Sequence, residues 1–251
     1  MKGMLWTTPL LLFLVTAQAL SQGSAGTGGG AEPRFLVDAP TAGMLKSGSL
    51  AFDIDFFQNG GILTSMNYGI MSRLSLGISY GGSNLIGDGT AEFNPLPGFN
   101  VKVRPFEEGM SFPAIVFGFD SQGREEYIDS LDRYTIQSKG LYIAGSKNFT
   151  MAGFFSIHGG ANYSLEGPED DREVAFFVGA EKTIGSAISA VLEYNSGGGK
   201  TSKGRGYLNL GLRWSPGGGF TIGFDLKDLV RNDEKVTIGN RSVKIEFLKP
   251  L

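Results

Sequence analysis

The stretch LNLGLRWSPGGGFTIGFDLK, residues 208–227, decides the fold class of this chain. Apolar residues occupy every second position up to Trp214, and the same alternation resumes at Phe220 after a short Gly-rich turn. A period of two places successive side chains on opposite faces of a β-strand. The stretch therefore predicts two antiparallel strands joined by a short turn, each with one apolar face and one polar face.

The same pattern recurs along the chain from residue 50 onward. Each alternating segment runs for about 8 to 11 residues, the length of a tilted membrane-crossing strand. The clear segments are 50–56, 74–80, 99–104, 155–163, 174–181, 188–195, 208–214, 220–227 and 243–247. Segments 62–69, 114–119 and 134–147 alternate less cleanly, and the last changes phase near Gly140, where a β-bulge would restore the pattern. The sequence predicts an all-β fold, an antiparallel transmembrane β-barrel of about 12 strands over residues 45–251.

The connections between these segments alternate in length. Short connections lie at 70–72, 106–112, 149–152, 183–185 and 215–219, and longer ones at 81–97, 120–133, 164–172, 196–203 and 228–240. Outer-membrane barrels have short periplasmic turns and longer extracellular loops. This rhythm favours a barrel over one alternative, a soluble exported β-sandwich that acts as a binding module.

The N-terminal residues indicate export. Lys2, an apolar run over 10–15 and the small-residue pattern Ala17-Gln18-Ala19 have the order of a signal peptide, predicted as residues 1–19. Residues 20–44 are predicted to be a flexible N-terminal lead-in, rich in Gly and Ser, that ends in a short ordered approach to the first strand. The predicted location is the outer membrane of a Gram-negative-type cell, where the partners are outer-membrane lipid and lipopolysaccharide.

Composition excludes several classes of function. The chain has 0 Cys, so it has neither disulfides nor a thiolate zinc site. Its net charge is -3, and its basic residues are spread along the chain, which gives no indication of nucleic acid as a partner. The sequence predicts no cofactor and no metal site.

The polar face of the predicted strands carries charges of both signs. Opposite charges in a confined space pair with one another and hold the surrounding structure. We therefore expect a salt-bridged network inside the barrel and a constricted, mostly blocked lumen. The residues of this lumen charge network are Asp53, Asp55, Lys102, Arg104, Glu181, Glu193, Arg213, Asp225, Lys227, Lys244 and Glu246.

His158 is the single histidine, and its predicted face also carries Ser156 and Asn162. A Ser, His and Asn set is similar to that of outer-membrane phospholipases, so an outer-membrane hydrolase acting on lipid or glycan stays open as an alternative. Residues two apart on one strand do not by themselves make a nucleophile and base pair, and no nucleophile-elbow motif accompanies them. No catalytic residue is assigned.

Short motifs between residues 39 and 147 carry a family resemblance. They are Pro40-Thr41-Ala42-Gly43, Gly60-Gly61, Arg73-Leu74-Ser75-Leu76-Gly77, Asn84-Leu85-Ile86-Gly87, Pro97-Gly98, Pro113-Ala114-Ile115 and Ser146-Lys147-Asn148. This set resembles the YjbH-type outer-membrane β-barrel proteins, a family linked with exopolysaccharide production and export. The resemblance implies exopolysaccharide or secretion components as further partners. The leading interpretation is a non-enzymatic outer-membrane β-barrel protein for envelope structure or exopolysaccharide secretion, with a narrow pore as one form.

Overall fold

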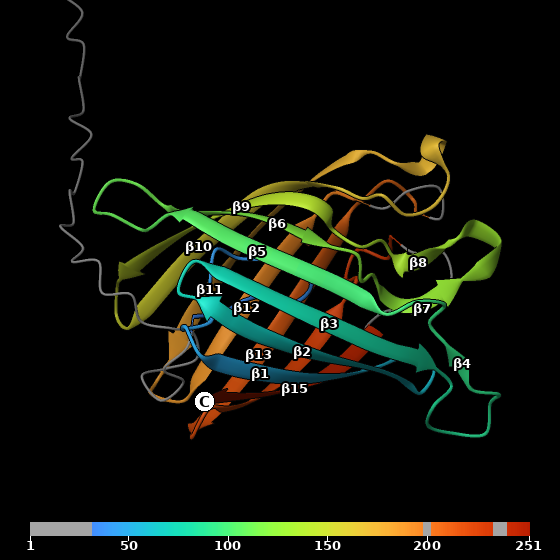
Figure 1. Cartoon of the computed structure of the whole chain (residues 1–251), viewed down its shortest axis with the longest axis horizontal. Coiled ribbons are helices and arrows are strands. Elements are labelled where there is room, and N and C mark those ends of the chain that lie inside the picture. Colours follow the sequence, from blue (N-terminus) through green and yellow to red (C-terminus); the bar gives the residue numbers. More distant parts are fainter. Residues whose placement is uncertain (1–31, 198–201, 233–239) are drawn as a thin grey trace, which may run out of the picture.

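The structure, a computed structural model, describes residues 32–197, 202–232 and 240–251. Within these residues, twelve antiparallel strands close into a barrel, in which β1 pairs with both β2 and the last strand, β15 (Figure 1). The barrel strands are β1 (Ser49–Phe57), β2 (Gly61–Met71), β3 (Leu74–Ser83), β5 (Gly98–Phe106), β6 (Ala114–Asp120), β9 (Gly140–Thr150), β10 (Phe154–Tyr163), β11 (Val174–Ile184), β12 (Ile188–Asn195), β13 (Tyr207–Gly217), β14 (Phe220–Lys227) and β15 (Asn240–Pro250). This arrangement confirms the predicted barrel and its strand number, and it rules out the β-sandwich.

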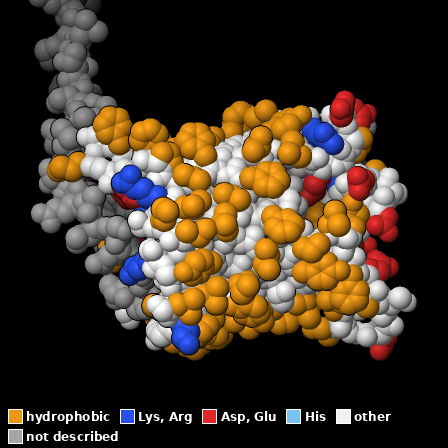
Figure 2. All heavy atoms as spheres, viewed as in Figure 1, with side chains coloured by type: hydrophobic (Ala, Val, Ile, Leu, Met, Phe, Trp, Pro, Cys, Tyr) orange, Lys and Arg blue, Asp and Glu red, His pale blue; other side chains and the backbone are white. Residues whose placement is uncertain are grey.

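The apolar face of the barrel strands points outward. Each barrel strand places at least one large apolar side chain on the surface, such as Phe99 on β5, Phe176 on β11 and Leu212 on β13. Figure 2 shows apolar side chains in a broad band over the middle of the visible face. A barrel of this kind suits a lipid environment because closure pairs its backbone groups between strands. No helix in the described part of the chain is long and apolar enough to cross a membrane.

The two ends of the barrel differ. The connections β2–β3, β5–β6, β9–β10, β11–β12 and β13–β14 form the end with short turns. The opposite end carries longer loops, which contain β4 (Glu92–Phe93), the hairpin of β7 (Arg124–Ile128) and β8 (Arg133–Ile136), and the short 3-10 helices η1 (Asp129–Leu131) and η2 (Glu169–Asp171) (Figure 1). Acidic side chains gather at the long-loop end in Figure 2.

The phase change near Gly140 has a different cause from the one predicted. Tyr134 lies in β8, outside the barrel wall, and β9 begins at Gly140, which has a left-handed φ of 55°. Leu141 and Ile143 face outward, as predicted. The predicted bulge within one strand is therefore wrong. The phase changes because β8 ends before Gly140 and a separate strand, β9, begins there.

Residues 32–45, which we call the lumen segment, lie inside the barrel. Nearly all side chains from Arg34 to Leu45 are buried, and the chain doubles back on itself at a turn in which Leu36 N donates to Ala39 O at 2.9 Å. Phe35 and Pro40 form a bridge across this turn. The sequence predicts this stretch only as the end of a lead-in and gives no indication that it lies in the lumen. The predicted signal peptide and residues 20–31 lie outside the described residues.

The lumen segment explains why 114–119 is apolar on both faces. The inward residues Ala114 and Val116 of β6 form a buried cluster with Ala39, Ala42 and Met44 of the lumen segment, together with Tyr142, Ala144 and Phe177 of the wall. An inner face that packs against another part of the chain has no need to be polar. The apolar inner side of β6 is thus one wall of a small core between barrel and lumen segment.

A charge placed in the apolar band tests its contact with lipid. Leu212 lies at the middle of β13, whereas Leu226 is next to the last residue of β14, and both side chains are exposed. We expect Leu212→Arg to lower the free energy of unfolding in lipid vesicles by about 2–4 kcal/mol and Leu226→Arg by about 0–1 kcal/mol. Equal losses, measured by urea unfolding, would contradict a membrane-embedded band.

Candidate functional site

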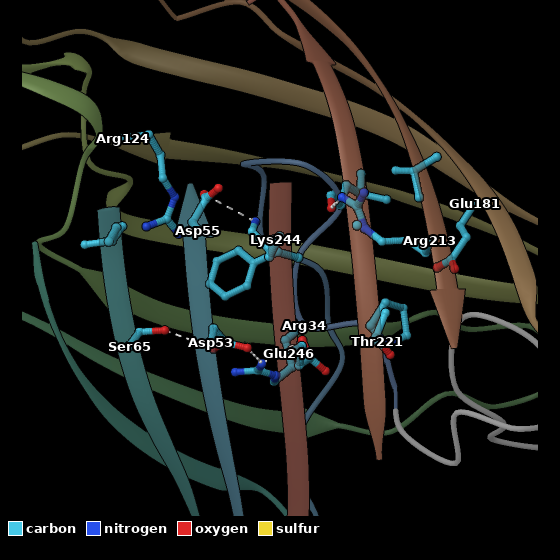
Figure 3. Close-up of a pocket in the computed structure, with 16 residues that line it drawn as sticks. Arg34, Asp53, Asp55, Ser65, Arg124, Glu181, Arg213, Thr221, Lys244 and Glu246 are labelled. Carbon is cyan, nitrogen blue, oxygen red and sulfur yellow. Dashed lines mark hydrogen bonds and ion pairs between the residues drawn. The ribbon is translucent and has the colours of Figure 1, made fainter. Parts of the chain in front are cut away.

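The first feature of the lumen is an arginine held between two facing carboxylates. Asp53 of β1 and Glu246 of β15 are directly opposite one another in the sheet. Arg34 of the lumen segment reaches both, with Nη2 at 2.5 Å from Asp53 Oδ1 and 2.8 Å from Glu246 Oε2 (Figure 3). Like charges opposite each other on adjacent strands are destabilising. Arg34 removes this repulsion and fastens the lumen segment to the seam between first and last strands.

The second feature is a carboxylate that binds the main chain of the turn. Glu193 of β12 is fully buried, and its Oε2 accepts hydrogen bonds from the backbone N–H groups of Val37, Asp38 and Ala39, at 2.9, 2.9 and 2.8 Å. Its other oxygen accepts from Asn209 Nδ2 of β13 at 2.9 Å. A carboxylate that collects several backbone N–H groups makes strong, charge-assisted bonds. Glu193 therefore fixes the position of the turn in the lumen.

Basic side chains of the wall bind the carbonyl groups of the same segment. Lys102 Nζ of β5 donates to Arg34 O, Thr41 O and Gly43 O at 3.1, 3.2 and 3.3 Å. Arg213 Nη2 of β13 donates to Leu36 O at 2.7 Å, and Lys244 Nζ of β15 donates to Val37 O at 3.0 Å. These bonds give partners to buried main-chain acceptors, of which Arg34 O also accepts from Thr41 N at 3.1 Å.

The turn also contacts the hairpin that folds in from the long-loop end. Lys227 Nζ of β14, almost fully buried, lies 3.0 Å from both Asp38 Oδ1 of the lumen segment and Glu125 Oε1 of β7. Arg124 of β7 packs over the ring of Phe35, 5.4 Å from its centre. Elements from the two ends of the barrel thus meet at one buried cluster.

The returning arm of the lumen segment is bound at the short-turn end. Arg104 of β5 pairs with Glu32 and donates to Ala42 O at 3.2 Å. Ser146 Oγ of β9 accepts from Ala42 N at 2.8 Å and also lies 2.7 Å from His158 Nδ1. Both arms of the segment are therefore hydrogen-bonded to the wall.

The predicted Ser, His and Asn set does not form a nucleophile and base pair. Ser156 Oγ donates to Asn148 Oδ1, whereas His158 bonds to Ser146. Among the described residues, His158 Nε2 and Asn162 Oδ1 have no hydrogen-bond partner. A nucleophilic serine needs a base that a third group orients, and this arrangement does not supply that group. Ser146 and His158 instead join the wall to the lumen segment.

The structure places the residues of the predicted charge network inside the barrel wall. Most contact the lumen segment, namely Asp53, Lys102, Arg104, Glu193, Arg213, Lys227, Lys244 and Glu246. The remaining three have contacts on the wall: Asp55 lies 3.9 Å from Lys244, Glu181 accepts from Ser189, and Asp225 pairs with Arg213. Sequence reasoning missed Arg34 and Asp38, the charged partners supplied by the lumen segment.

Little open space remains beside the lumen segment. One cavity, lined by Arg34, Asp53, Lys244 and Arg213 among others, offers about 70 Å³ to the centres of water molecules (Figure 3). A second, near the short-turn end and lined by Arg104, Ser146 and His158, offers about 80 Å³. Since one water needs about 10–15 Å³ by this measure, each cavity has room for several waters.

Removing Arg34 tests the pairing at the seam. We expect Arg34→Met to lower the free energy of unfolding by about 1–3 kcal/mol, because two facing carboxylates lose their partner. Adding Asp53→Asn removes the repulsion, so the double variant should regain part of the loss. Urea unfolding of both variants in detergent measures the effect, and a double variant less stable than Arg34→Met would contradict this account.

Comparisons with known proteins support the fold. No protein-family model matches the sequence, and no curated protein matches it. Among solved structures, a KdgM porin is similar with a TM-score of 0.51 and 11% sequence identity, over 79% of this chain and 98% of that chain. A NanC porin structure has a TM-score of 0.45 and 10% identity, over 80% of this chain and 99% of that chain. Nothing in these findings supports the YjbH-type assignment specifically. The chain thus has a porin-like β-barrel fold.

Proposed function

We propose that this protein is a non-enzymatic outer-membrane channel whose passage is restricted by its own residues 32–45. The observation that carries the proposal is the lumen segment itself, which fills the barrel and is bound to opposite walls by Arg34, Glu193 and Lys102. A barrel of about eight strands is filled by wall side chains alone, whereas one of roughly 16 to 18 leaves an aqueous channel. A barrel of twelve strands lies between these sizes, and the lumen segment occupies the space that its wall side chains leave.

The flanking cavities are the proposed route of water and small ions past the lumen segment. Their linings carry both signs of charge, as Arg34, Lys244, Asp55 and Glu181 illustrate. We expect a confined lining with both signs of charge to conduct small ions weakly. In its resting state the protein is therefore a narrow pore.

The proposed compartment is the outer membrane of a Gram-negative-type cell, with the apolar band in lipid and the long loops at the lipopolysaccharide side. Export by a signal peptide over residues 1–19 belongs to the same proposal. A part in envelope structure or exopolysaccharide secretion rests on the YjbH-type resemblance alone. The lumen geometry favours the channel over the hydrolase.

Single-channel recording in planar bilayers tests the proposal. The wild-type protein should show small currents. The Arg34→Met/Glu193→Gln variant should show currents several-fold larger, because it loses contacts on both sides of the lumen segment. Glu166→Gln is a matched control, since Glu166 is a partly buried carboxylate of the long-loop end that accepts hydrogen bonds from Tyr134 N and Ser138 N, apart from the lumen segment.

A disulfide between the lumen segment and the wall allows the current to be lowered and then restored in the same sample. Ala42 N lies 2.8 Å from Ser146 Oγ, and the chain has 0 Cys, so Ala42→Cys/Ser146→Cys supplies one pair of neighbouring thiols for a disulfide between lumen segment and wall. In the weakened variant this bond should bring the current down to the wild-type level, and reduction should restore it. Large, porin-like currents from the wild-type protein, or currents of the weakened variant that stay the same with and without the cross-link, would overturn the proposal.

A further inference from the structure

The wall recognises the lumen segment mainly through its main chain. Glu193 accepts from the N–H groups of Val37, Asp38 and Ala39, and Ser146 accepts from Ala42 N. None of these bonds involves a side chain of the segment. The wall therefore binds the backbone of a tight turn. The side chains of the segment add ion pairs on either side of this turn.

Basic side chains of the wall donate to the carbonyl groups of the same turn and its two arms. Lys102, Arg213 and Lys244 bind carbonyl oxygens of residues 34, 36, 37, 41 and 43. Glu193 and Lys102 come from different strands, β12 and β5. A pattern of acceptor and donors held on a rigid wall is a preorganised binding site, because the wall does not have to reorder to form it.

The lumen segment lies inside the barrel and is not a strand of its sheet. Its backbone bridge, Phe35 with Pro40, lies within the segment, and the strand ladder of the wall begins at Ser49. The connection to β1 runs through Lys46 and Ser47, which are both exposed. Cutting this connection would leave each hydrogen bond described above intact.

We propose that the lumen contains a peptide-binding site, built from Glu193, Lys102, Arg213 and Lys244, for which residues 32–45 act as an exchangeable ligand. The ligand class is a peptide with a tight turn that presents three successive N–H groups. This inference rests on the proposed function, since exchange at the site is what would open the channel. Attachment through residues 46–48 keeps the ligand at a high effective concentration, so the site stays occupied in the intact chain.

Cleavage after folding separates the ligand from its site. A protease recognition sequence inserted between Lys46 and Ser47 lets the folded full-length protein be cut without a deletion that could impair folding. The released fragment should stay bound at first and dissociate on prolonged dilution, as followed by mass spectrometry of the barrel fraction. A fluorescent synthetic peptide of residues 32–45 should then bind to the emptied barrel.

Two changes test the recognition of the main chain. The peptide N-methylated at Val37 and Ala39 keeps its side chains and loses two N–H donors, and it should bind at least about tenfold more weakly, equivalent to 1.4 kcal/mol. Glu193→Gln in the barrel should weaken binding of the unmodified peptide similarly, while the Glu166→Gln barrel should bind it as the wild type does.

The outcomes separate this inference from the proposed function. Equal binding of the methylated and unmodified peptides, or a fragment that neither leaves nor returns, overturns the peptide site. Bilayer currents are recorded on the same samples. If the peptide exchanges as expected but current does not change, the site stands and the channel function fails. If current rises after cleavage while methylation has no effect on binding, the channel stands and the site is wrong.

Discussion

The hydrogen bonds between wall side chains and the main chain of residues 32–45 determine whether the lumen of this barrel is filled or open. An unpaired N–H or C=O group inside a protein costs free energy, so a peptide can stay in a lumen only if its polar groups find partners. Glu193 meets this requirement for the N–H groups of the turn, and Lys102 meets it for several carbonyls. Without these bonds the segment would be more stable in water, and the barrel would hold an open, highly charged lumen.

The charges of the wall depend on the segment in turn. Asp53 and Glu246 face each other across the seam that closes the barrel, and Arg34 lies between them. Lys227 binds Asp38 and Glu125 together, which joins the lumen segment to the hairpin of the long-loop end. Removing one member of such a buried pair leaves an uncompensated charge. The free energy lost in this way is larger than the net stabilisation that the intact pair provides. Wall, segment and hairpin are therefore one electrostatic unit.

Local periodicity was enough to predict the wall. Alternation at period two, as in 208–214 and 220–227, gave the strands, their faces and their order, because each side of a membrane strand meets a single kind of environment. The inward charges were predicted from the same pattern. Their partners were not, because Arg34 and Asp38 lie in a stretch with no strand period. The place of this stretch is set by contacts with residues distant in the sequence, such as Glu193 and Lys227. The apolar inner face of 114–119 was the one signal in the sequence that something packs inside the barrel.

The claim that residues 32–45 occupy the lumen in the membrane is tested most directly by thiol accessibility. Val37 is fully buried at the turn, whereas Ser47 is exposed in the connection to β1, and cysteines at these positions would be the single thiols of the chain. With the protein in lipid vesicles, a bulky water-soluble maleimide should modify Ser47→Cys rapidly and Val37→Cys only after unfolding. Modification of both cysteines at the same rate would contradict a filled lumen, and with it the account of this protein as a restricted channel.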